Sequence, residues 1–134
     1  MKNRYLCLVE EITSKLIREK FCEYNRLYFD DVLKLPAFKM NVWNNGIIGK
    51  FKNKRDENKK PIKPEIWISK YALFTEDTLR EVILHEMIHY YIIFVEGYDG
   101  LFPHGWRFRR MCKKFYKKYG IKIHRNAKHI PYKK

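Results

Sequence analysis

The longest predominantly apolar stretch of the chain covers residues 82–95. Its apolar side chains would cover a helix almost all the way round, which is typical of a helix buried on every side. We expect a central helix here, capped by Thr75 or Asp77 and ended by Gly97. Besides two tyrosines, three ionisable side chains interrupt the stretch, namely His85, Glu86 and His89.

Shorter patterns flank this central helix. Residues 5–33 place apolar side chains three and four positions apart, which predicts an N-terminal helix that ends before Leu35-Pro36. From Phe38 onwards apolar and polar residues alternate, as they do in half-buried strands. We expect three strands, and the turn residues Asn44-Asn45-Gly46 would join the first two as a hairpin. The strands cover residues 38–43, 47–51 and 65–69.

The C-terminal part of the chain predicts one more helix, which begins near His104 and is stopped by Gly120. Residues 121–134 form a basic tail to which the pattern assigns no regular element. The length of 134 residues suits one domain with one core. The expected fold is therefore α+β, over residues 1–134, with an N-terminal helix, a small three-stranded antiparallel sheet, the central helix and a basic C-terminal helix.

The chain is strongly basic. Its formal net charge is +14, from 29 Lys and Arg against 15 Asp and Glu, which favours a polyanionic partner such as nucleic acid. From Gly100 to the end of the chain there are twelve basic and no acidic residues. The candidate contacts to nucleic acid are the basic side chains of the last helix: Arg107, Arg109, Arg110, Lys113, Lys114, Lys117 and Lys118.

A second basic segment lies between the expected strands. Residues 50–64 hold seven basic side chains against Asp56 and Glu57, and residues 52–64 have the composition of an exposed loop that ends at Pro61 and Pro64. Two interpretations stay open for this loop. It is either a solvated tip or a finger that contacts a nucleic-acid backbone.

Cysteines and apolar runs indicate where the protein works. The three cysteines form no Cys-x-x-Cys pair, so the sequence predicts neither a zinc ribbon nor a disulfide framework. Unclustered cysteines suit a reducing compartment. The N-terminal residues lack the pattern of a signal peptide, and no apolar run is long enough for a membrane span. We expect a cytoplasmic protein with no membrane partner, in which association with DNA is compatible with the charge.

The polar residues of the central helix point to a metal site. Histidines four positions apart stand on one face of a helix, so His85 and His89 can reach the same ion. Glu86 would lie beside that ion, where a general base belongs. The alternative is a pair of core histidines bonded to backbone carbonyls, with Glu86 in a buried salt bridge. Two histidines and a glutamate on an otherwise apolar helix favour the metal.

A catalytic zinc site takes three protein ligands, so one more residue is required. Its position in the sequence favours His104, because the loop before it is long enough to fold back on the central helix. The other candidates are His124, His129, Glu96 and Asp99.

The order His85-Glu86-x-x-His89 followed by His104-Gly105-x-x-Phe108 resembles the SprT-like metallopeptidase domain, the family that includes the Spartan proteases. Tyr24-Asn25-x-x-Tyr28-Phe29, followed by a Leu-Pro, is also similar to that family. The resemblance covers roughly residues 20 to 120. The first motif is shared by many zinc peptidases, and the His-Gly-x-x-Phe element is more selective.

This resemblance implies a minimal zincin-like metalloprotease core with one zinc ion. His85, His89 and His104 would match the metal ligands of the family, and Glu86 would match its catalytic glutamate. Spartan-type members are DNA-dependent proteases that digest proteins crosslinked to DNA, which agrees with the basic charge. The expected partners are thus a protein substrate and DNA.

The expected reaction is metal-assisted hydrolysis of a peptide bond, in which Glu86 moves a proton from water to the leaving amine. The sequence does not single out an oxyanion donor among Tyr90, Tyr91, Tyr98 and Arg107. One alternative is a non-catalytic nucleic-acid-binding protein with a structural zinc, although Glu86 would have no purpose in a closed site. Another is a zinc hydrolase that acts on something other than protein.

Overall fold

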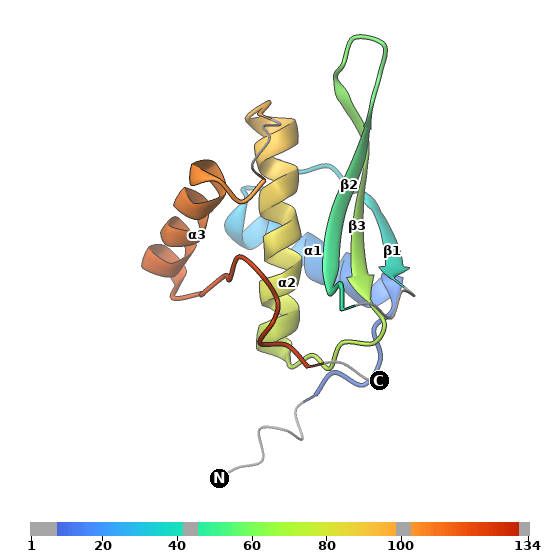
Figure 1. Ribbon diagram of the computed structural model, residues 1–134, viewed down its shortest axis with the longest axis vertical. Coiled ribbons are helices and arrows are strands. Elements are labelled where there is room, and N and C mark those ends of the chain that lie inside the picture. Colours follow the sequence, from blue (N-terminus) through green and yellow to red (C-terminus); the bar gives the residue numbers. More distant parts are fainter. Residues whose placement is uncertain (1–7, 42–45, 99–102, 132–134) are drawn as a thin grey trace.

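The computed structural model describes residues 8–41, 46–98 and 103–131. Three α-helices and three strands follow one another as α1 (Ser14–Tyr28), β1 (Ala37–Asn41), β2 (Gly49–Arg55), β3 (Pro61–Ser69), α2 (Glu76–Tyr90) and α3 (Trp106–Tyr119), with a π-helical turn η2 (Tyr91–Val95) directly after α2. The α+β class is as predicted. Helix α2 lies between the sheet and α3 (Figure 1). Within the described ranges, no helix is both long and apolar enough to cross a membrane.

Helix α2 is the centre of the fold. Thr75 caps it, because its hydroxyl accepts the Thr78 N–H at 3.1 Å and the Thr78 hydroxyl accepts the Thr75 N–H at 2.9 Å. The acidic residues Glu76 and Asp77 occupy the first turn, where the helix dipole favours negative charge. Burial on nearly all sides is as predicted, and the buried residues are Leu79, Glu81, Val82, Ile83, Leu84, Glu86, Met87, Ile88 and Tyr90.

The helical segment ends at Gly97 as predicted, but its last turns are not regular α-helix. Regular α-helix stops at Tyr90, and the chain continues as the π-helical turn η2 before it reaches Gly97, whose φ is +71°. The wider turn is closed by a hydrogen bond from the Glu96 N–H to the Tyr91 carbonyl at 3.1 Å. Turns of this kind are frequent at functional sites.

The three-stranded sheet is mixed, and the prediction of an antiparallel sheet was wrong in this respect. The strand order is β1-β3-β2, with β1 parallel and β2 antiparallel to β3. The hairpin is therefore formed by β2 and β3, and not by the first two strands. Alternation of apolar and polar residues identifies strands but not their partners, because a strand can pair on either edge. The expected turn residues Asn44 and Asn45 lie outside the described residues.

The hairpin of β2 and β3 projects well beyond the helices (Figure 1). Most of the segment predicted as a loop, residues 52–64, is part of these two strands. Asp56 stabilises the turn between them, because its Oδ1 accepts the N–H groups of Asn58 at 2.9 Å and Lys60 at 2.8 Å. Strand β1 pairs with β3 only from Glu65 onwards. Pro61 and Pro64 thus lie where β3 has a free edge, and the missing N–H groups leave no ladder bond unmade.

The N-terminal helix is shorter than the predicted residues 5–33. It begins after Thr13, whose hydroxyl accepts the Leu16 N–H at 3.1 Å and so caps the helix. The preceding residues pack in an extended form, and the Val9 N–H donates to the Phe74 carbonyl at 2.8 Å. The apolar spacing before Thr13 reflects this packing rather than a helix. Residues 1–7 lie outside the described ranges.

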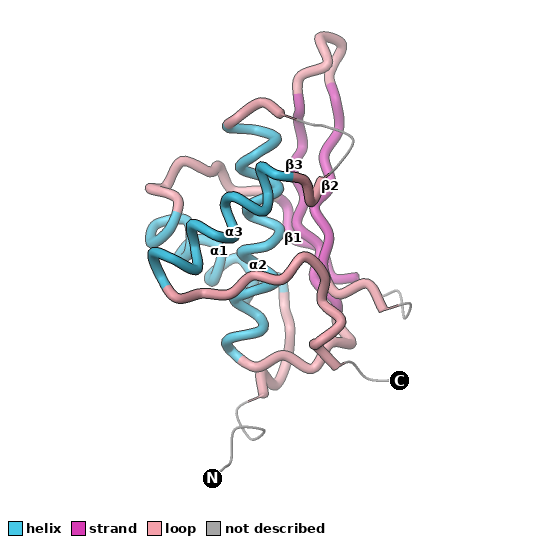
Figure 2. The backbone as a smooth tube through the Cα atoms, turned by 60° about the vertical axis from the view of Figure 1, so that its left-hand side comes forward, coloured by secondary structure: helices cyan, strands magenta, loops and turns pink. Residues whose placement is uncertain are grey.

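Helix α3 ends as predicted at Gly120, which adopts the left-handed conformation with φ +70°. The chain then runs back over α2 towards the sheet as an irregular segment, residues 121–131 (Figure 2). Its side chains Ile121, Ile123 and Ile130 are buried in the core. The Leu73 N–H donates to the Pro131 carbonyl at 2.7 Å, so this C-terminal segment is part of the packed structure.

One buried side chain organises the chain after α1. The Asn25 Nδ2 donates to the Leu33 carbonyl at 2.8 Å, and its Oδ1 accepts the Leu33 N–H at 3.2 Å. We expect Asn25→Ala to lower the free energy of unfolding by about 2 to 4 kcal/mol, because it leaves two buried backbone groups without partners. Urea unfolding monitored by circular dichroism would measure this loss.

The exposed Asn58 provides the control, since its backbone and not its side chain bonds Asp56. Asn58→Ala should change the unfolding free energy by less than about 0.5 kcal/mol. Equal effects of the two substitutions would contradict the role given to Asn25.

Candidate metal centre

Three histidines from two parts of the chain meet beside α2. His85 and His89 come from successive turns of α2, and His104 comes from the residues just before α3. The Nε2 atom of His104 lies 3.1 Å from the Nε2 atoms of both helix histidines, and those two atoms are 3.3 Å apart. The three nitrogens thus form a nearly regular triangle.

This triangle has the size that a bound zinc ion requires. With zinc–nitrogen bonds of about 2.0–2.1 Å, two ligands of a tetrahedral site lie about 3.3–3.4 Å apart. The observed separations of 3.1–3.3 Å are close to one face of such a tetrahedron. Three imidazole nitrogens and one open position fit a catalytic zinc site better than a closed structural one. The donor set is therefore compatible with zinc.

Phe108 explains why the motif after His104 ends in an aromatic residue. It lies on the first turn of α3 and is 1% exposed. Its ring centroid lies 4.7 Å from those of His85 and His89 and 4.9 Å from that of His104. One apolar ring thus packs against all three imidazoles and limits the orientations that they can adopt.

The backbone of the C-terminal segment fixes the orientation of His85. Its Nδ1 lies 3.0 Å from the carbonyl oxygen of His124. A carbonyl only accepts hydrogen bonds, so Nδ1 carries the proton and Nε2 keeps its lone pair. Bonds of this kind from the second ring nitrogen commonly hold a metal-binding histidine in place.

Burial keeps these imidazoles neutral. Desolvation, together with the charge of His104, lowers the pKa of His85 to about 4. Desolvation, followed by the charges of the other two histidines, lowers the pKa of His89 to about 3. Desolvation and then Arg125 lower the pKa of His104. The Nε2 lone pairs are consequently available for a metal ion at neutral pH.

Glu86 follows His85 on α2, lines the same cavity as His85 and His104, and is 5% exposed. Burial raises its pKa to about 8. Strand β2 approaches its carboxylate closely at Gly49: a Cβ atom built there would lie 3.0 Å from Glu86 Oε2 and 2.8 Å from Val82 Cγ1. Only glycine leaves this space free.

Two cavities flank His104. The first, of about 420 Å³, lies between the start of β2, helix α2 and the C-terminal segment, and both His85 and Glu86 line it. The second, of about 400 Å³, is lined by Ile92, Ile93 and the first turn of α3. His104 and Arg125 line both cavities, so the two cavities lie next to each other at the candidate metal centre.

The remaining candidate ligands lie elsewhere. His124 and His129 both bond Glu81, and Glu96 pairs with Arg107 at 3.7 Å. Asp99 lies outside the described residues. The sequence missed Glu81 as a functional candidate, although its place one turn before His85 on a buried helix was a usable signal.

The four candidates for an oxyanion donor separate into two groups. The Tyr90 hydroxyl donates to the Lys34 carbonyl at 2.8 Å, and Tyr91 packs on Phe29 with ring centroids 5.8 Å apart. Tyr98 and Arg107 line the second cavity, where the guanidinium lies 4.2 Å from the tyrosine ring centroid.

The basic residues of α3 are mostly exposed. Arg107 is the exception, because it is half-buried, paired with Glu96 and stacked on Tyr98 and Trp106. The other six candidate contacts to nucleic acid are exposed to solvent: Arg109, Arg110, Lys113, Lys114, Lys117 and Lys118.

The site combines two histidines one helical turn apart, a third histidine just before α3, and a buried glutamate that lines the same cavity. Such an arrangement is found in metal-dependent hydrolases. The model of the SprT-like family matches residues 17–129, so the chain belongs to the SprT-like family. This membership supports a domain of the zinc-metallopeptidase type. A search of curated proteins gives no significant match.

The close approach of β2 to α2 gives a test of the site's packing. We expect Gly49→Ala to lower the free energy of unfolding by about 1 to 3 kcal/mol, because the added methyl group must displace Val82 and Glu86. Chemical unfolding of the metal-free protein would measure this change.

Lys54→Ala, at an exposed position of the same strand, provides the comparison and should change stability by less than about 0.5 kcal/mol. A Gly49→Ala protein as stable as the wild type would show that the contact between β2 and α2 is looser than described.

Proposed function

We propose that this protein is a zinc-dependent peptidase of the SprT type that acts on proteins associated with or crosslinked to DNA. The observation that carries the proposal is the triangle of Nε2 atoms with separations of 3.1–3.3 Å, next to a buried glutamate that lines the same cavity. Membership of the SprT-like family supports the same class of reaction.

His85, His89 and His104 would hold the zinc ion through their Nε2 atoms. When bound there, the ion would supply the Lewis acidity that activates a water molecule and polarises the scissile carbonyl. The protein contributes the rest of the chemistry. Phe108 and the His124 carbonyl hold the imidazoles in the orientation that leaves these nitrogens facing one another.

Glu86 is the residue that moves the proton. Its carboxylate takes a proton from the attacking water and delivers it to the amine that leaves. Burial raises its pKa to about 8, and a nearby cation would favour the charged form and bring that pKa down. A general base with a pKa near the working pH can both accept and return a proton.

The two cavities support a polypeptide as the substrate. They lie on either side of His104, and each has a volume suited to side chains or a short backbone segment. A chain that occupied both would carry its scissile bond past the three histidines. Tyr98 and Arg107, in the second cavity, are the remaining candidates for stabilising an oxyanion.

The charge of α3 supports DNA as the partner. Arg109, Lys113 and Lys117 are four residues apart and therefore form one exposed stripe along the helix. Arg109 also lines the second cavity, so this stripe begins beside the metal centre. The neighbouring stripe of Arg110, Lys114 and Lys118 lines a hollow that also contains Asp30 and Glu96, and those carboxylates weaken its attraction for phosphate.

The first test of this function is the substitution Glu86→Gln. We expect it to lower peptidase activity at least about 100-fold, because an amide cannot take the proton, while the zinc content stays at that of the wild type. The measurement follows cleavage of a histone and of the enzyme itself, with and without DNA, alongside zinc analysis.

Glu76→Gln is the matched control, since Glu76 lies on the same helix but is exposed and pairs with Lys20. It should leave cleavage unchanged. Full activity of Glu86→Gln would contradict the mechanism. A wild-type protein that binds zinc and DNA but cleaves nothing would favour a non-catalytic binding protein.

The second test concerns DNA. Replacing Arg109, Lys113 and Lys117 together with alanine should weaken DNA binding and make the slope of log affinity against log salt concentration shallower by about 2 to 3, which corresponds to three lost phosphate contacts. Fluorescence anisotropy with labelled single- and double-stranded DNA, at several salt concentrations, would measure both quantities.

The control removes the same charge from another helix. Lys15, Arg18 and Arg26 are exposed on α1, where Glu19 and Glu23 lie among them. Their triple replacement with alanine should have a much smaller effect on DNA binding. Equal losses in the two triple variants would indicate that net charge, and not the stripe on α3, determines affinity.

A further inference from the structure

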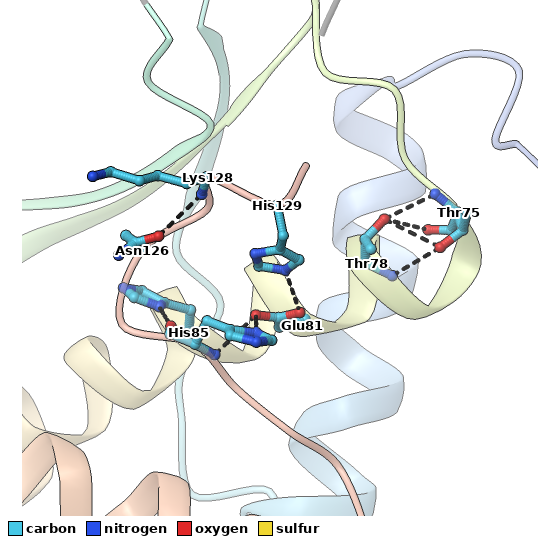
Figure 3. A network of polar contacts seen from close by, with 8 residues as sticks. Thr75, Thr78, Glu81, His85, Asn126, Lys128 and His129 are labelled. Carbon is cyan, nitrogen blue, oxygen red and sulfur yellow. Dashed lines mark hydrogen bonds and ion pairs between the residues drawn. The ribbon is translucent and has the colours of Figure 1, made fainter. Parts of the chain in front are cut away.

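A second polar cluster lies on α2, one turn before the candidate zinc ligands. Its centre is Glu81, which is 8% exposed. Its Oε2 accepts two hydrogen bonds from His124, from the backbone N–H at 2.9 Å and from Nδ1 at 2.8 Å. Its Oε1 accepts a bond from the His129 Nε2 at 3.0 Å. Figure 3 shows the Glu81 carboxylate bonded to His129, with His85 further along the same helix.

The cluster is joined to the metal centre through a single residue. His124 donates its backbone N–H to Glu81, and its own carbonyl oxygen accepts the proton on His85 Nδ1 at 3.0 Å. The N–H and the carbonyl of residue 124 are thus both bonded to side chains of α2, Glu81 and His85, which lie one helical turn apart. Residues 121–131 form no regular helix or strand, and the buried Ile121, Ile123 and Ile130 anchor the segment as a whole. At residue 124 itself, the bonds to Glu81 and His85 add to that anchoring and hold the carbonyl beside His85.

We propose that Glu81 is a positioning residue of the zinc site. Glu81 holds residue 124 in place, and the carbonyl of residue 124 in turn fixes the orientation of the His85 ring. The same carbonyl keeps the proton of His85 on Nδ1, which leaves Nε2 free to bind the ion. This inference rests on the zinc site of the proposed function. It predicts that Glu81 contributes to zinc affinity without touching the ion. Loss of such supporting bonds typically weakens metal binding about 10- to 100-fold.

The contacts of Glu81 with His124 and His129 favour a hydrogen-bonded cluster over a second metal site. All three distances, 2.8, 2.9 and 3.0 Å, are those of direct hydrogen bonds to a carboxylate. One of the three donors is a backbone N–H, which cannot bind a cation. Burial alone would raise the pKa of Glu81, but the bonds from His124 and His129 outweigh it and lower that pKa, so the carboxylate stays charged.

The test compares the zinc affinity of the wild type, Glu81→Gln and Glu76→Gln by competition with a chromophoric chelator. The amide of Glu81→Gln keeps the shape of the side chain but loses the charge and one acceptor. We expect it to bind one zinc ion about 10- to 100-fold more weakly than the wild type. Glu76→Gln, on the exposed side of the same helix, should bind zinc as the wild type does.

A second pair of measurements separates positioning of His85 from general support of the fold. His129→Ala removes the bond to Glu81 Oε1 but leaves both bonds to His124. It should therefore change zinc affinity much less than Glu81→Gln. In nuclear magnetic resonance spectra of the imidazoles, the His85 Nδ1 proton should be protected from exchange in the wild type and in His129→Ala, and should exchange faster in Glu81→Gln.

A variant that keeps the backbone of residue 124 covers the case in which Glu81→Gln does not fold. His124→Ala retains the backbone N–H and carbonyl and loses only the ring bond, so it should weaken zinc binding by less than about tenfold. Unchanged affinity in a folded Glu81→Gln would overturn the proposal, and if that variant does not fold, unchanged affinity in His124→Ala would overturn it. A wild type that binds two zinc ions and loses one in Glu81→Gln would also overturn it. A wild type that binds no zinc would instead refute the proposed function.

Discussion

The burial of polar groups on α2, a helix that is covered on nearly all sides, is the constraint from which the rest of this structure follows. Glu81, His85, Glu86 and His89 lie on α2 among apolar residues that face the sheet, α1 and α3. Removing such groups from water is costly unless each finds a partner. The fold supplies partners for Glu81 and for the Nδ1 of His85 from its own C-terminal segment. The three Nε2 atoms instead face one another, and a cation is the partner that would satisfy them together.

The elements around α2 serve this centre in different ways. The start of α3 brings His104 to the helix histidines and places Phe108 against all three rings. Strand β2 approaches Glu86 closely enough that only glycine fits at position 49. The segment after α3 crosses α2 and bonds both Glu81 and His85 through residue 124.

Local chemistry was predictable from the sequence, and long-range pairing was not. The Thr75 cap, the stop at Gly120 and the three histidines that lie together each depend on a short motif or on regular helical spacing. Their role as zinc ligands stays a prediction. The mixed sheet was missed because alternation does not select a strand's partner. The position of Glu81 on a buried helix was a usable signal, but its partners could not be identified because they lie more than 40 residues away. No pattern within the helix indicates such contacts.

We infer that His85, His89 and His104 together bind one zinc ion. Anomalous diffraction at the zinc absorption edge, from crystals of the zinc-loaded protein, would locate that ion. We expect one peak within about 2.0–2.1 Å of all three Nε2 atoms, with Glu86 beside it and not bound to it. A peak at Glu81, His124 and His129, or none at the three histidines, would contradict this inference.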